Sequence, residues 1–82
     1  MVSSADTEAL VRYLVTSLVD APDAVTIQTT ETEESLTFEV TLDPADVGKV
    51  IGRQGRIIKA IRTLARAAGS TASRQVEVEV VG

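Results

Sequence analysis

The chain has 82 residues, of which 44% are hydrophobic and 24% are charged, and its formal net charge is −4. This length fits one small domain, residues 1–82, and the composition is that of an ordinary soluble globular protein. The sequence contains no cysteine and no histidine, which excludes disulfides, zinc sites of the Cys/His type and catalysis by a thiol or an imidazole.

These exclusions predict a protein that is not an enzyme, with no catalytic residues, no bound metal, no cofactor and no small-molecule substrate. The sequence has no run of 18 or more apolar residues, so no membrane-spanning helix is expected. The first eight residues are polar and acidic, unlike the basic start and apolar run of a secretory signal. We therefore expect a cytoplasmic protein without a membrane partner.

The first half of the chain predicts a helix and then a hairpin. Ser3 or Ser4 can cap the helix, and the turn-forming residues 20–23 end it. Its apolar residues recur at helical spacing: Leu10, Val11, Leu14, Val15 and Leu18. Residues 25–30 and 36–42 alternate between the two faces of a strand, and the short connection between them indicates an antiparallel pair.

The second half predicts two helices separated by glycines, and a last strand. We expect a helix start at 43–46, a helix to about residue 51, a loop at 52–55, a helix at 56–68 and a strand at 76–80. Pro44 suits a first helical position and Gly69 suits a C-terminal cap. A small polar loop at 70–74 joins the last helix to the last strand.

The predicted element order is α-β-β-α-α-β, and each strand has one apolar and one polar face. Helices packed on the apolar face of a single sheet satisfy this pattern, which is the two-layer α+β sandwich. The last strand arrives after a helical crossover, so it should be parallel to one of the first two. The expected fold is a three-stranded mixed sheet with helices on one face.

Charge is segregated along the chain. Residues 47–76 contain seven lysines and arginines and no acidic residue, whereas the rest contains twelve acidic residues and one base, Arg12. Soluble surfaces usually mix the two signs, so this basic tract indicates an anionic partner. A basic helix face that is merely solvated is the alternative.

The glycine loop at 52–55 offers a site for an anion. Gly52 and Gly55 lack Cβ atoms, so the backbone can approach a phosphate closely at the N-terminus of the next helix. Cations are disfavoured at a helix N-terminus, so Arg53 and Arg56 at this end favour a bound anion. Lys49 and Lys59 flank the loop, and Arg62 and Arg66 lie further along the same helix. A tight turn between helices is the alternative.

The sequence VIGRQGRIIKAI, residues 50–61, resembles the signature of the KH domain, whose GXXG loop clamps about four backbone nucleotides of single-stranded RNA. The element order is similar to that of type II KH domains. The whole chain resembles the small bacterial single-KH RNA-binding proteins of the KhpA family. The resemblance implies a type II KH fold, in which Arg53 and Gln54 are the variable loop residues that meet the phosphates. By the same analogy Val50 and Ile51 contribute to an apolar floor of the groove that holds the bases, and the alternative is that both are core residues.

The same resemblance implies an RNA chaperone that acts as a homodimer or with a KhpB-type partner protein. It further implies a link to cell elongation, division and peptidoglycan homeostasis. A protein-interaction and dimerisation module whose GXXG loop does not bind RNA is the alternative function.

The only aromatic residues are Tyr13 and Phe38, so base stacking is limited, and weak binding with little sequence preference is expected.

Overall fold

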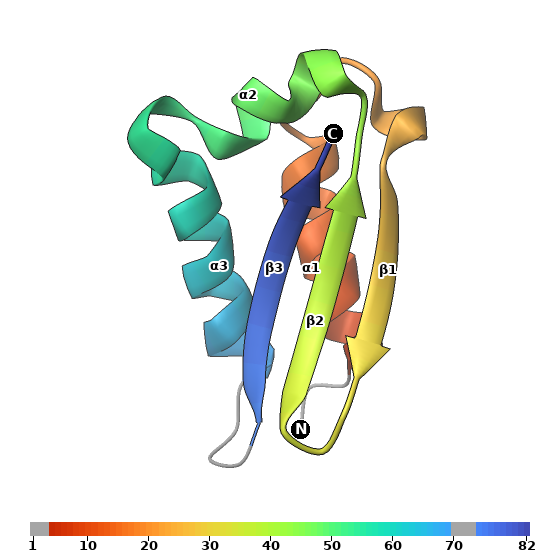
Figure 1. The fold of residues 1–82 in the computed structure, drawn as a ribbon, viewed down its shortest axis with the longest axis vertical. Helices are drawn as coiled ribbons and strands as arrows, with labels where there is room; N and C mark the ends of the chain where they lie inside the picture. The colour runs from red at the N-terminus through yellow and green to blue at the C-terminus, as the bar shows by residue number, and fades with distance from the viewer. Residues whose placement is uncertain (1–3, 70–73) are drawn as a thin grey trace.

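The computed structural model describes residues 4–69 and 74–82 (Figure 1). Its helices and strands are α1 (Ser4–Thr16), β1 (Thr26–Glu31), β2 (Ser35–Thr41), α2 (Val47–Ile51), α3 (Arg56–Gly69) and β3 (Gln75–Val81). Short 3-10 turns span Pro22–Ala24, Pro44–Asp46 and Arg53–Gly55. The order α-β-β-α-α-β confirms the predicted α+β, type II arrangement. A cap at Ser3 and the loop at 70–73 lie outside the described residues.

The three strands form one mixed sheet in the order β1-β2-β3. β1 and β2 are antiparallel, with Thr29 opposite Phe38, and β3 is parallel to β2, with Val78 beside Phe38. Both relations agree with the prediction, because a short connection reverses the chain and a helical crossover restores its direction. β2 is therefore the central strand, and β1 and β3 are the two edges.

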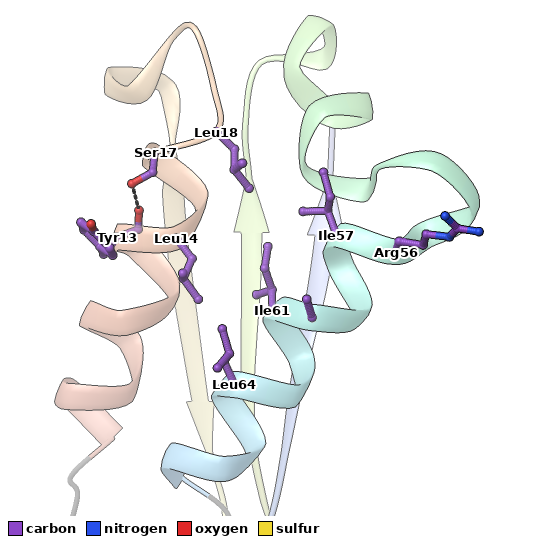
Figure 2. Close-up of a pocket in the computed structure, with 9 residues that line it drawn as sticks. Tyr13, Leu14, Ser17, Leu18, Arg56, Ile57, Ile61 and Leu64 are labelled. Carbon is purple, nitrogen blue, oxygen red and sulfur yellow. Dashed lines mark hydrogen bonds between the residues drawn. The ribbon is translucent and has the colours of Figure 1, made fainter.

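The core lies between the sheet and helices α1 and α3, which cover the same face (Figures 1 and 2). The buried strand residues occupy alternate positions and are Ile27, Leu36, Phe38, Val40, Val76 and Val78. The helices bury Val11, Val15, Ile58, Ile61 and Ala65 against them. The opposite face of the sheet is polar, and Glu39 there lies beside Glu79 in register. No described helix has the length and hydropathy needed to cross a bilayer.

Helix α1 ends at Thr16, earlier than the predicted stop near Asp20. The hydroxyls of Thr16 and Ser17 donate to the carbonyls of Arg12 and Tyr13 at 2.7 and 2.6 Å. The Tyr13 carbonyl also accepts from the Ser17 N–H at 3.1 Å, so these hydroxyls add to the backbone hydrogen bonds at the end of the helix. Leu18, which periodicity placed in the helix, therefore lies beyond it and is 36% exposed.

Gly69 is the last residue of α3, but it lacks the positive φ that is typical of a glycine cap. Its role is to allow close packing. A Cβ atom at this position would lie 2.9 Å from Thr7 Oγ1 and 3.1 Å from Val76 Cγ2. The glycine therefore allows α3 to approach α1 and β3 closely at the same point.

A buried carboxylate joins the start of α2 to the turn after α1. The Asp46 side chain is 3% exposed and accepts a hydrogen bond from Lys49 Nζ at 2.9 Å. It also accepts from the backbone N–H groups of Asp20 and Ala21, at 3.3 and 3.1 Å. The hydrogen bond from Lys49, with the two backbone N–H groups, lowers the pKa of Asp46 below its ordinary value of 3.8, although burial opposes this. The charged form of Asp46 thus stabilises the folded state.

Replacing Asp46 with asparagine should lower the melting temperature at about pH 7. The substitution removes the negative charge, and it replaces one acceptor oxygen with an NH₂ group that faces the N–H donors of the protein. The stabilisation by Asp46 is complete above its ordinary pKa of 3.8 and is lost as the pH falls through the lower pKa of the folded protein. The deficit of Asp46→Asn should therefore shrink in strong acid. Circular-dichroism melts between about pH 7 and pH 2 measure it, with the exposed Asp23→Asn as control. An equal deficit at both ends of this range would contradict the assignment.

Candidate nucleic-acid interface

The loop between α2 and α3 has three residues with positive φ within residues 52–55. Gly52 has φ 76° and ψ 175°, Gln54 has φ 57° and ψ 24°, and Gly55 has φ 72°. The Gly52 N–H donates to the carbonyl of Gly48 at 2.9 Å, and the Gly55 N–H donates to that of Gly52 at 3.2 Å. Gln54 is a non-glycine residue in the left-handed region, a form of local strain that concentrates at functional sites.

The two glycines of the loop serve different purposes. A Cβ atom on Gly52 would lie 2.6 Å from Ile57 Cγ1, so the loop backbone packs directly against the first turn of α3. A Cβ atom on Gly55 would meet only Ile58 Cγ2, at an ordinary 3.8 Å. Gly52 therefore permits both the close approach and the turn, whereas Gly55 supplies only its positive φ.

The side chains of the loop face solvent. Arg53 and Gln54 are exposed, as are Arg56 and Lys59 on the first turn of α3. Arg56 Nη2 donates to Gln54 Oε1 at 3.3 Å. The structure thus brings six predicted site residues, Gly52, Arg53, Gln54, Gly55, Arg56 and Lys59, to one exposed region at the N-terminus of α3.

Lys49, the seventh predicted site residue, is held by two carboxylates. Its ammonium contacts Asp20 Oδ2 at 2.5 Å and Asp46 Oδ1 at 2.9 Å. These two hydrogen bonds, from Asp20 first and then Asp46, raise the pKa of Lys49 above 10.5. Its charge is therefore balanced locally, and the observed contacts tie α2 to the turn after α1. The sequence does not indicate the contact between Lys49 and Asp20, because the two residues are 29 positions apart.

Arg62 and Arg66 lie against the outer edge of β3. Arg62 Nε donates to the carbonyl of Val78 at 3.1 Å, and Arg66 Nε donates to that of Val76 at 3.2 Å. Arg66 also pairs with Glu77 at 3.3 Å. Edge strands present unpaired carbonyls, and these arginines satisfy two of them. Arg62 and Arg66 therefore have a structural role at the edge of the sheet.

The apolar floor that the resemblance implied at Val50 and Ile51 is only partly at the surface. Val50 is fully buried in the core, whereas Ile51 is half-buried and packs against it. Val50 is therefore a core residue, and Ile51 alone is accessible beside the loop.

Comparison with known proteins places this arrangement in a family. The KH-domain model described as "KhpA/KhpB, KH domain" matches residues 8–80. A protein of Listeria monocytogenes serovar 1/2a named RNA-binding protein KhpA is 45% identical over 74 residues, covering 90% of this chain and 97% of that protein. A protein of the same name from Clostridium perfringens is 46% identical, covering 88% of this chain and 96% of that protein.

A solved structure shares the fold. The crystal structure of Aquifex aeolicus Era bound to GDP and AlF4- superimposes with a TM-score of 0.58 at 21% sequence identity. The match covers 92% of this chain but 30% of the Era chain. The likeness concerns the fold alone, and it extends over nearly the whole of the present chain.

The loop geometry makes a matched pair of glycine substitutions informative. Gly52→Ala should destabilise the protein by roughly 1–3 kcal/mol, because it combines a disallowed backbone conformation with a clash against Ile57. Gly48→Ala should instead stabilise it by about 0.4–1 kcal/mol, since Gly48 is helical and a Cβ atom there would meet nothing within 4 Å. Urea unfolding measures both changes. Equal effects of the two substitutions would show that the loop backbone adapts.

Proposed function

Because the chain belongs to the KhpA/KhpB family of KH domains, we propose that it binds single-stranded RNA through the GXXG loop (residues 52–55) and the basic first turn of α3. One observation carries this proposal. An exposed loop with two positive-φ glycines stands directly before a helix N-terminus, and its neighbours are cationic instead of the acidic residues that a helix start favours.

The positive φ of Gly52 and Gly55 turns the loop so that its exposed backbone can approach a phosphate at the start of α3. The N-terminus of α3 adds a partial positive charge behind it. Arg53 and Gln54 reach the phosphates from the loop, and Arg56 and Lys59 extend the positive surface along the helix. These are contacts to the RNA backbone, so they position the strand and carry little sequence information.

The remaining surface directs RNA toward this side of the molecule. The outer face of the sheet carries Glu39, Glu77 and Glu79, which repel phosphate. The bases would lie between the GXXG loop and the edge of β3, beside Arg62 and Arg66. With Phe38 fully buried and Tyr13 on a different part of the surface, on α1, no aromatic platform serves the bases, so binding is weak and unselective.

Further assignments rest on family resemblance. They are a role as an RNA chaperone in the cytoplasm, self-association into a homodimer and action with a KhpB-type partner. Post-transcriptional control linked to cell elongation, division and peptidoglycan homeostasis belongs to the same proposal. Curated relatives are named for binding RNA and not for a reaction, in keeping with a protein that is not an enzyme.

A charge-matched pair of double variants tests RNA binding by the loop. Arg53→Asp with Gln54→Asp should weaken binding of a labelled single-stranded RNA at least tenfold, because two phosphate-facing side chains become repulsive. Arg12→Asp with Gln28→Asp makes the same two replacements on α1 and the outer sheet face, away from the loop. Fluorescence anisotropy measures the affinities, and circular dichroism verifies that both variants are folded.

The two variants separate a local contact from a general effect of charge. Wild-type binding should also weaken as salt rises from about 50 to 200 mM, as counterion release requires. If both double variants lose binding equally, the effect is one of net charge and the loop is not the site. If wild type itself does not bind, the interaction module without RNA binding becomes the better account.

A further inference from the structure

The outer edge of β1 (Thr26–Glu31) is open. Within the described residues β1 has one neighbouring strand, β2, and the helices pack on the inner face of the sheet (Figure 1). The exposed residues of β1 are Thr26, Gln28, Thr30 and Glu31. A strand at the edge of a sheet directs every second pair of backbone N–H and C=O groups away from its neighbour. These groups of β1 are therefore available to pair with a further strand.

The opposite edge of the sheet is closed to such pairing. There Arg62 and Arg66 of α3 donate to the carbonyls of Val78 and Val76 on β3. Proteins also protect edge strands with lysine, proline or a β-bulge. β1 contains no lysine, arginine or proline, and its six residues pair with β2 in unbroken register. β1 is therefore a regular edge strand that lacks these protective features.

The chain around the open edge is acidic. Residues 20–46 contain eight aspartates and glutamates and no lysine or arginine. Glu31, Glu33 and Glu34 are exposed at the end of β1 and in the hairpin, and Glu39 is exposed on the outer face of β2. Of these four, Glu31 alone forms an ion pair with a described cation. This edge of the molecule therefore attracts a cationic partner and repels an anionic one.

The same charge argues against RNA and against a second copy of the chain as the occupant. RNA would bring phosphates next to the glutamates. A second copy would bring its own β1 with the same acidic residues, and like charges on paired strands are destabilising. No strand of this chain contains lysine or arginine, so a second copy has no basic strand to offer. A basic extended segment of another protein fits the edge best.

We propose that the outer edge of β1 binds an extended segment of another protein with lysine or arginine at alternate positions, which adds a fourth strand to the sheet. In this mode of recognition the main-chain hydrogen bonds supply affinity and the alternating side chains supply selectivity. The basic side chains lie on the acidic outer face of the sheet. Because β1 and β3 are opposite edges, the chain can hold this segment and RNA at the same time.

Amide chemical shifts of the ¹⁵N-labelled full chain test the proposal, with a short synthetic peptide of alternating lysine and valine as the probe. The largest shifts should fall within residues 26–31 and alternate along β1, since only every second residue directs its N–H outward. Residues 52–56 should keep their shifts. Two control peptides should not bind: one has glutamate in place of lysine, and the other keeps its lysines but has a methyl group on every backbone nitrogen.

A matched pair of variants separates the edge from general charge. Gln28→Lys and Gln75→Lys make the same replacement at exposed positions on the outer sheet face, on β1 and on β3 respectively. Gln28→Lys should weaken binding of the lysine peptide roughly two- to fivefold, because like charges then face each other on paired strands. Gln75→Lys should bind the peptide as wild type does. Circular dichroism verifies that both variants are folded.

Four other results would overturn the proposal. They are no shifts at millimolar peptide, equal binding of the N-methylated peptide, equal weakening in the two variants, and shifts at residues 26–31 that follow protein concentration without peptide. The second and third would show unspecific attraction of charge, and the fourth would assign the edge to a second copy. RNA binding is tested separately, because a short RNA added to the peptide complex should still shift residues 52–56.

Discussion

The turn at Gly52 is the constraint on which the rest of the arrangement depends. Residue 52 has φ 76° and ψ 175°, and a Cβ atom there would clash with Ile57. Only glycine therefore fits at this position without strain. This turn sets the direction of α3, which then buries Ile58 and Ile61 against the sheet. The same turn leaves residues 53 and 54 on the surface, directly before a helix N-terminus. The packing of the core and the exposure of the loop thus have one cause.

The rest of the surface consists of regions that differ in charge. The basic residues of α3 lie along one side, where Arg62 and Arg66 also satisfy the open edge of β3. The acidic residues of the outer sheet face disfavour a polyanion on that side of the molecule. The surface between α1 and α3 has Arg56 as its one charged lining residue and exposes the apolar side chains of Tyr13, Leu18 and Leu64. A chain with a net charge of −4 can therefore still present a cationic surface to a polyanion on one side.

Sequence patterns predict the elements and the sheet well, because burial repeats every second residue in a strand and every 3.6 residues in a helix. They also predict the loop, since two glycines between helices are unfavourable unless the backbone needs them. They do not predict the partner of Lys49, because its pairing with Asp20 depends on tertiary packing. Nor do they predict that Leu64 is exposed, because periodicity identifies the apolar side of α3 but not how much of it the sheet covers.

Amide chemical shifts of ¹⁵N-labelled protein test most directly whether RNA contacts the backbone of the GXXG loop. Adding a short single-stranded RNA should produce its largest shifts at residues 52–56 and smaller ones along the first turns of α3 and at β3. The outer sheet face and α1 should stay unchanged. Shifts concentrated on α1 or on the outer sheet face, with residues 52–56 unaffected, would contradict the account.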